Sequence, residues 1–140
     1  MKHYLKTLLL LFFLLTSLCK VRSQSADSSR YFYLKAMEEK SNRLYQPAYN
    51  DFQHSLEYDS LNTDALRAAG LTAVELRKYE NAIVAFEKLV AVRKKDTTAV
   101  SQLAILYFWT HRWEKAVSYA TLANQLHAGQ NNYYILHLFS

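Results

Sequence analysis

The sequence has few of the residues that interrupt helices: one proline and two glycines among 140 residues. Because glycine and proline are the strongest breakers of regular structure, long helices can run almost without interruption. The chain also has a single cysteine, Cys19, which excludes a framework of disulfide bonds within the chain. An apolar core must therefore stabilise the fold, and 51% of the residues are hydrophobic.

The side chains that carry most enzyme chemistry are sparse or scattered. The five histidines include no close pair of the kind that binds zinc with a supporting carboxylate. Two glycines cannot build a glycine-rich phosphate loop, and no Ser-His-Asp order or carboxylate pair indicates a catalytic pocket. We therefore expect no enzymatic activity, no cofactor and no metal.

The segment 1–23 has the pattern of a secretory signal peptide. Basic residues precede an apolar run at residues 8–15, and Val21 and Ser23 place the expected cleavage before Gln24. We expect an exported chain, periplasmic or secreted, of bacterial origin. Two alternatives stay open. One is a membrane anchor, although a spanning helix needs about 20 apolar residues, and the other is lipid attachment at Cys19.

Removal of this segment takes the net charge almost to zero. The full chain has 17 basic and 12 acidic residues, of which four basic and no acidic ones lie in 1–23, which leaves 13 against 12. Nucleic-acid binding needs clustered Lys and Arg, so we expect no nucleic acid partner. We also expect no membrane span in the mature chain. We interpret the basic run at residues 93–95 as solvated cations at a helix end. Docking of an acidic partner or an anionic membrane is the alternative.

The rest of the chain repeats itself at a fixed interval (79 − 45 = 113 − 79 = 34). Three aromatic residues stand at this interval, and an alanine follows each of them three positions later: Tyr45 and Ala48, Tyr79 and Ala82, Trp113 and Ala116. A small residue precedes each alanine by twelve positions: Ala36, Gly70 and Ala104. Apolar residues recur between them at helical spacing. We predict a pair of helices of about 14 and 12 residues per unit, with second helices beginning near Gln46, Tyr79 and Trp113.

This repeat resembles the tetratricopeptide repeat, whose period is about 34 residues. The resemblance implies an all-α fold, a right-handed superhelical solenoid of antiparallel helix pairs. The predicted organisation in chain order is a signal peptide at 1–23, a short lead at 24–28, repeats at 29–62, 63–96 and 97–130, and at 131–140 the first helix of a fourth repeat or a capping helix.

The resemblance also implies how the helices pack. The small residues let the two helices of a unit approach closely, and a large ring, Phe52 or Phe86, fills the space between units. In the third unit Ala120 stands in place of the ring. Trp113 is expected to compensate for it.

In this family the first helices of the repeats line an inner groove for peptides or partner helices, so the resemblance implies a scaffold that binds another protein. The groove would be lined by Arg30, Tyr33, Met37, Lys40, Asp64, Arg67, Leu71, Val74, Thr98, Ser101, Ile105, Phe108 and Trp109. The family's chaperone-tail binders hold a terminal carboxylate with a basic and asparagine clamp, which Tyr33, Met37 and Leu71 do not match. For Phe108 and Trp109, packing under a following repeat is the alternative to ligand contact.

The end of the sequence leaves the extent of the protein open. Residues 131–140 restart the repeat with several apolar side chains, but no second helix follows. We expect end-to-end self-association through 131–140, or a need for residues beyond Ser140, with closure by a short capping helix as the alternative. The alternative function is accordingly the N-terminal portion of a longer exported protein whose enzymatic or membrane part follows Ser140. A structural spacer without a partner is a third hypothesis.

Overall fold

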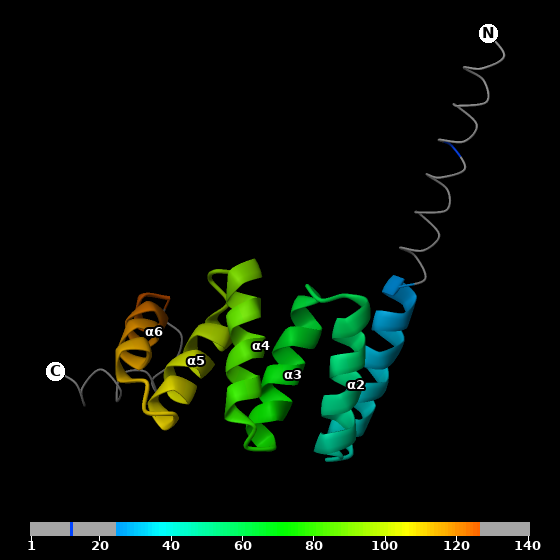
Figure 1. The fold of residues 1–140 in the computed structure, drawn as a ribbon, viewed down its shortest axis with the longest axis horizontal. Coiled ribbons are helices and arrows are strands. Elements are labelled where there is room, and N and C mark those ends of the chain that lie inside the picture. Colours follow the sequence, from blue (N-terminus) through cyan, green and yellow to red (C-terminus); the bar gives the residue numbers. More distant parts are fainter. Residues whose placement is uncertain (1–11, 13–24, 127–140) are drawn as a thin grey trace, which may run out of the picture.

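The computed structural model describes residue 12 and residues 25–126. The helices over 25–126 are a helical segment at residues 25–41, α2 (Tyr45–Tyr58), α3 (Thr63–Glu75), α4 (Tyr79–Val92), α5 (Thr97–Trp109) and α6 (Trp113–Gln125). They form three hairpins, which we call the first (25–41 and α2), the second (α3 and α4) and the third (α5 and α6) (Figure 1). The predicted signal peptide and the predicted helix at 131–140 lie outside the described residues.

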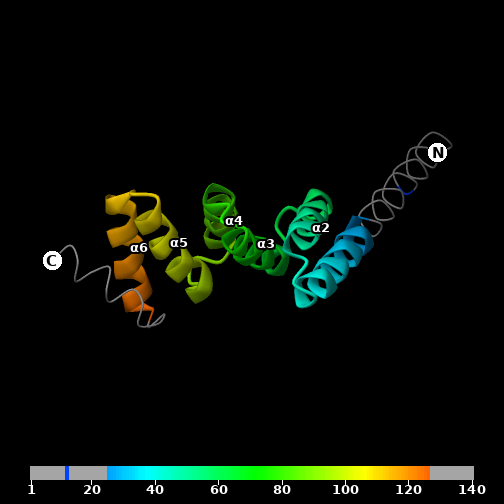
Figure 2. The same ribbon diagram turned by 90° about the horizontal axis from the view of Figure 1, so that it is seen from below.

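The hairpins stack in chain order along one axis. Each helix from α2 to α5 packs on the helix that follows it, so α2 and α3 join the first two hairpins and α4 and α5 join the second and third. Seen from below, the segment 25–41 and α3 lie toward one side of the row and α2 and α4 toward the other (Figure 2). The predicted all-α solenoid of helix pairs is confirmed, and no strand occurs over residues 25–126.

Side-chain caps begin the first helix of the second and of the third hairpin. The side chain of Asn62 accepts hydrogen bonds from the backbone N–H groups of Asp64 and Ala65, and Asp96 accepts one from Ala99. Such caps satisfy N–H groups that have no partner inside the helix. Asn62 and Asp96 are one repeat apart in the sequence, so the start of each helix follows the sequence repeat.

The turn inside every hairpin uses the left-handed backbone conformation. Arg43, Arg77 and His111 have φ values of 60°, 56° and 59°, and they too recur at the interval of the repeat. This conformation costs a residue with a side chain about 1–2 kcal/mol, and glycine normally takes such positions. Here two arginines and a histidine take this conformation, so no glycine in the sequence marks these turns.

The small residues allow the close packing that the sequence predicts. A methyl group added to Gly70 would lie 2.7 Å from Cζ of Phe86, so the Phe86 ring rests directly on the α3 backbone. Phe52 is fully buried and packs with Ala68 and Ala69, which belong to the second hairpin. Each ring therefore fills space that a small residue on a neighbouring helix leaves open.

The third hairpin fills its core differently from the prediction. Ala120 is fully buried in the same core cluster as Leu103 and Tyr107. Trp113 is 41% exposed and contacts Phe108 and His111 at the edge of the hairpin. The expectation that Trp113 compensates for Ala120 is therefore wrong. The Trp113 ring packs instead on Phe108 and His111, at the turn between α5 and α6.

Candidate binding surface

The predicted groove residues fall on the first helix of each hairpin. Arg30, Tyr33, Met37 and Lys40 lie on the segment 25–41, Asp64, Arg67, Leu71 and Val74 on α3, and Thr98, Ser101, Ile105, Phe108 and Trp109 on α5. None of them is fully buried. They are therefore accessible in part, and contact with a ligand through them stays a prediction.

The apolar members of this set are anchored in the core while one side remains accessible. Leu71, Val74, Ile105 and Phe108 are partly buried and pack against the core cluster of the second and third hairpins. Tyr33 packs against the core of the first, with its ring 5.9 Å from the ring of Phe52. Because packing restricts their rotamers, these side chains would lose little entropy on binding a partner.

The two most exposed apolar side chains of the set stand at opposite ends of it. Met37 is 42% exposed and Trp109 is 49% exposed. The Trp109 ring lies 5.3 Å from the ring of Tyr79 at the start of α4. Trp109 therefore rests on the preceding hairpin and still presents about half of its surface, as an aromatic anchor for a partner would.

The two charged members of the set on α3, Asp64 and Arg67, are already paired. The Arg67 guanidinium donates to Asp96 at 2.6 Å and to Asp64 at 3.0 Å. The hydrogen bond to Asp96 raises the pKa of Arg67 above its ordinary value. Burial pushes the pKa of Asp96 up, but the Ala99 N–H and the Arg67 guanidinium outweigh it, so that pKa lies below its ordinary value. An incoming carboxylate would have to compete with both aspartates for Arg67.

The same ion pair lies in a hollow that the sequence reasoning misses. The hollow has a volume of about 730 Å³ and is lined by Arg67, Arg93, Lys94, Lys95, Asp96, Thr97 and Thr98. The run 93–95 is the loop between α4 and α5, and its side chains are exposed, in keeping with solvated cations. The loop nevertheless sits beside two predicted groove residues, Arg67 and Thr98. The signal that links them is Asp96, which follows the basic run and caps the next helix.

A second hollow lies between the second helices of two hairpins. It has a volume of about 330 Å³, and Tyr49 of α2 and Asn81 of α4 are among its lining residues. The Asn81 side-chain amide donates to the Tyr49 hydroxyl at 3.0 Å. The hydroxyl and the amide that line this hollow thus bind each other, and the contact ties the first hairpin to the second.

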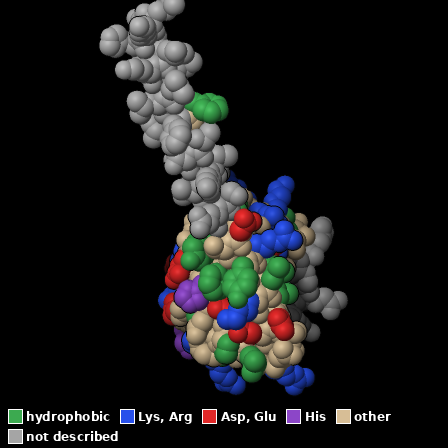
Figure 3. Space-filling model, turned by 90° about the vertical axis from the view of Figure 1, so that its right-hand side faces the viewer, with side chains coloured by type: hydrophobic (Ala, Val, Ile, Leu, Met, Phe, Trp, Pro, Cys, Tyr) green, Lys and Arg blue, Asp and Glu red, His purple; other side chains and the backbone are tan. Residues whose placement is uncertain are grey.

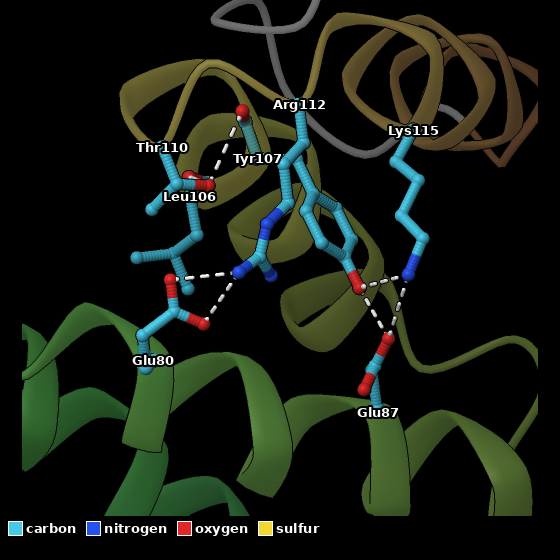
Figure 4. Close-up of polar contacts among 7 residues, drawn as sticks. All are labelled: Glu80, Glu87, Leu106, Tyr107, Thr110, Arg112 and Lys115. Carbon is cyan, nitrogen blue, oxygen red and sulfur yellow. Dashed lines mark hydrogen bonds and ion pairs between the residues drawn. The ribbon is translucent and has the colours of Figure 1, made fainter.

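Polar contacts hold the third hairpin in a set position on the second (Figure 4). Arg112 donates to both carboxylate oxygens of Glu80, at 2.9 and 2.8 Å. The hydroxyl of Tyr107 donates to Glu87, and the ammonium group of Lys115 lies 3.6 Å from the same carboxylate. Burial, followed by the bond to Glu87, raises the pKa of Tyr107 above its ordinary value.

A related contact occurs one repeat earlier. Lys78 donates to the side chain of Gln46 at 2.8 Å, and the pair Lys78 and Gln46 corresponds by the repeat to the pair Arg112 and Glu80. Lys78 and Arg112 directly precede α4 and α6. Each thus donates to the first turn of the second helix in the hairpin before it. These contacts join neighbouring hairpins at equivalent positions of the repeat.

Two other kinds of site are absent over the residues that the structure describes. No group of three His, Cys, Asp or Glu side chains there could hold a metal ion. None of the described helices is both long and apolar enough to cross a membrane.

Comparison with known proteins identifies the fold. No protein-family model matches the sequence, and no curated protein matches it. Solved structures do match. The TPR domain of Arabidopsis OM64 has a TM-score of 0.69 at 15% identity, covering 77% of this chain and 89% of that one.

Two further matches come from different settings. The first TPR of Spaghetti (RPAP3), solved with the HSP90 peptide SRMEEVD, has a TM-score of 0.68 at 16% identity, covering 76% of this chain and 85% of that one. The type III secretion translocator chaperone SycD of Yersinia enterocolitica has a TM-score of 0.66 at 18% identity, with 77% and 74% covered. At these identities the likeness concerns the fold alone: the described helices are arranged as in tetratricopeptide repeat domains.

Proposed function

We propose that the chain is a non-catalytic scaffold that binds a segment of another protein along the first helices of its three hairpins. The observation that carries the proposal is a row of partly exposed apolar side chains on equivalent positions, Met37, Leu71 and Ile105. Each follows the last by one full repeat. A solenoid presents such repeated positions along one continuous surface, and a structure with the same fold was solved with a bound peptide.

The chemistry of this face favours a partner segment of mixed character. Its C-terminal part is apolar and ends in Trp109, which is half exposed beside Tyr79. The middle carries the hollow around Arg67 with the basic loop 93–95. A segment with an aromatic or aliphatic residue for the first region and an acidic residue for the second would complement both.

Selection from a displayed peptide library tests this proposal. Peptides that bind the full chain are measured by calorimetry against Met37→Glu and Trp109→Ala, with Val84→Glu as the matched control. Val84 is 51% exposed but lies on α4. We expect both face variants to weaken binding at least about tenfold, which is about 1.4 kcal/mol, with the helical melt retained. Peptides that bind both face variants as tightly as the unchanged chain would overturn the proposal.

We also propose that the chain is exported and is cleaved before Gln24. The support is the charged start, the apolar run and the small residue at the expected cleavage position. Cell fractionation with N-terminal sequencing is the test, and a mature chain beginning at Gln24 is the expected result. A lipid-modified start at Cys19 would favour the lipoprotein alternative, and an intact start in the cytoplasm would contradict export.

Two points about the extent of the protein remain proposals. Self-association through 131–140 predicts that Ile135→Glu and Phe139→Glu lower the mass seen by light scattering at high concentration. The alternative, that this scaffold precedes a further enzymatic or membrane part, is tested by reading the gene past the codon for Ser140.

A further inference from the structure

Apolar side chains reach the surface of this chain in two different settings. On the end face of the first hairpin, hydrophobic side chains lie among charged ones (Figure 3), as they do on the surface of most proteins. The hollow between α2 and α4 differs, because its lining residues surround a volume of about 330 Å³. This volume is at the lower end of the range for ligand pockets, about 300–1,000 Å³, and so suits a ligand with a single ring.

The lining of this hollow combines apolar side chains with polar groups. Leu66 is buried in the core cluster, Leu56 is partly buried against it, and Val84 is 51% exposed. The apolar lining thus leads from the core to the surface. Binding pockets add to such a lining a few polar groups that orient the ligand. The polar lining residues here are Tyr49, Gln53, Glu80, Asn81 and Lys88.

The contact between two neighbouring hairpins, which we call a joint, is filled differently in the next repeat. At the joint of the second and third hairpins, the rings of Tyr107 and Tyr119 stack with their centroids 5.5 Å apart. The residues one repeat earlier are Ala73 and Ala85, and Ala85 lines the hollow. The hollow therefore lies where the chain has a small residue and the next joint has a phenol ring.

The acceptor for a phenol hydroxyl also has an equivalent in the hollow. At the next joint, the hydroxyl of Tyr107 donates to Glu87. Burial, followed by the charge of Glu87, raises the pKa of Tyr119 above its ordinary value, so both phenols lie near this carboxylate. The residue one repeat before Glu87 is Gln53, which lines the hollow. Its amide carbonyl can accept the same hydrogen bond.

The tyrosine that the chain itself has at the hollow belongs to the wall. Tyr49 is 9% exposed, and its hydroxyl accepts a hydrogen bond from the Asn81 amide at 3.0 Å. The Lys78 ammonium group lies 4.8 Å from the centre of the Tyr49 ring. These contacts hold the ring in place, and the hollow is the space that remains beside it.

We propose that the hollow between α2 and α4 binds one tyrosine side chain of a partner protein. The ring takes the place that Tyr119 fills at the next joint, and its hydroxyl donates to Gln53. Tyrosine suits such a site because it combines a large apolar ring with a polar tip, and it is enriched among the residues that dominate interfaces. The inference is independent of the binding face proposed above, because no lining residue of the hollow belongs to that face.

The first test uses p-cresol, which is a tyrosine side chain without its backbone. The full chain is titrated while the NMR signals of the side-chain amides of Gln53 and Asn81 are followed. We expect saturation with a dissociation constant of about 1 mM, which a ligand of about eight non-hydrogen atoms can reach. Gln53→Leu should weaken the binding of p-cresol at least about threefold and should not weaken the binding of toluene, which has no hydroxyl.

The second test fills the hollow from within. Ala85→Tyr supplies the ring of the next joint and should weaken the binding of p-cresol at least about tenfold, which is about 1.4 kcal/mol. Val92→Tyr is the matched control, since Val92 is 45% exposed on the same helix and does not line the hollow. It should leave the dissociation constant unchanged.

The reverse change keeps the result interpretable if Ala85→Tyr does not fold. Tyr119→Ala removes the ring from the next joint, and cavities left by such a change bind small aromatic molecules. Because a ligand stabilises the state that it binds, p-cresol should raise the melting temperature of Tyr119→Ala more than that of the unchanged chain.

A peptide arm separates a partner's tyrosine from a free phenol. The blocked peptide Gly-Gly-Tyr-Gly-Gly should displace p-cresol, and the same peptide with alanine in place of tyrosine should not. A tyrosine peptide that does not compete would show that the hollow admits only free phenols, and the proposed partner would be wrong. Unchanged amide signals of Gln53 and Asn81, equal binding by Ala85→Tyr and Val92→Tyr, or no added stabilisation of Tyr119→Ala would each overturn the site itself.

Discussion

The first and third hairpins share one sequence spacing but fill equivalent positions with different chemistry. Lys35 and Asp51 form an ion pair in the first hairpin, and the residues two repeats later are Leu103 and Tyr119. Leu103 is fully buried and Tyr119 packs against the core. The difference follows from what covers each face. The third hairpin packs on the second, whereas the described residues place no hairpin before the first.

The largest effect is expected when the lysine of the first hairpin, Lys35, is placed at the equivalent position of the third hairpin, Leu103. Leu103→Lys buries an ammonium group among apolar side chains, which should cost about 3 kcal/mol or more of unfolding free energy. Urea denaturation followed by helical signal measures it. The reciprocal change, Lys35→Leu with Asp51→Tyr, should cost less, because the Lys35 side chain is 45% exposed although Asp51 is buried. A Leu103→Lys variant as stable as the unchanged chain would show that the contact between the second and third hairpins does not bury this position.

The next largest effect is expected at the contact between Gly70 and Phe86 in the second hairpin, which corresponds to the contact between Ala36 and Phe52 in the first. Gly70→Ala places a methyl group within 2.7 Å of the Phe86 ring, and overpacking of this kind costs about 1–3 kcal/mol. Alanine otherwise favours a helix over glycine by about 1 kcal/mol, so the net loss of unfolding free energy should be about 0–2 kcal/mol. The equivalent Ala36 already carries a methyl group opposite Phe52.

The control for this contact is the ring itself. Adding Phe86→Leu should reduce the cost of Gly70→Ala, since the smaller side chain leaves room for the methyl group. Thermal and urea unfolding of the two single variants and the double variant give the coupling energy. A Gly70→Ala variant that melts above the unchanged chain would contradict the close approach.

A third test compares the two capped joints through their pH dependence. Asn62 and Asp96 both cap a first helix, but only Asp96 is ionisable and bound to Arg67. Its pKa is lower in the folded chain than its ordinary value. The stability it contributes is therefore present above the ordinary pKa and is lost as the pH falls through the folded value.

Asp96→Asn should keep the cap, because asparagine caps as well as aspartate, and lose the ion pair. We expect a loss of about 1 kcal/mol at pH 7 that disappears in acid. Urea unfolding from pH 7 to pH 2.5 measures this difference in stability. Asn62→Asp is the matched control, because the side chain of Asn62 contacts the Ser29 hydroxyl and not an arginine. A constant difference between Asp96→Asn and the unchanged chain at all pH values would exclude the pairing as its cause.

The smallest effect concerns a feature that all three hairpins share. Arg43→Gly, Arg77→Gly and His111→Gly each relieve a left-handed backbone conformation. The gain is offset by the greater freedom of glycine in the unfolded chain, so each variant should be more stable by about 0.5–1 kcal/mol. Thermal unfolding of the three variants measures it, and similar gains are expected because the turn is the same. A gain at one position only would indicate that the side chains there contribute unequally.

Much of the fold can be predicted because its signals are local and recur at one interval. Tyr79 and Trp113 are expected to begin helices, and they are the first residues of α4 and α6. Gly70 is expected to permit close packing, and the Phe86 ring lies against it. The exported state, the partner and residues 131–140 remain predictions.

Other features cannot be predicted because they join positions whose separation depends on the angle between hairpins. Tyr107 and Glu87 meet only when α5 packs on α4. The hollow beside Arg67 forms only when α3 lies beside the loop 93–95 and the start of α5. The expectation for Trp113 fails for a related reason, since a repeat position does not tell whether a ring turns inward or toward the edge.

Sequence alone establishes that this chain is built from helix pairs at one fixed period, where each second helix begins, and which small residues let the helices meet. It can do so because helical periodicity and residue size act within one unit. The packed structure is needed to show which faces are covered, that Arg67 is already paired with Asp96, and that Leu34 is exposed. Those properties depend on the stacking of whole hairpins, where a face is buried or open according to its neighbour.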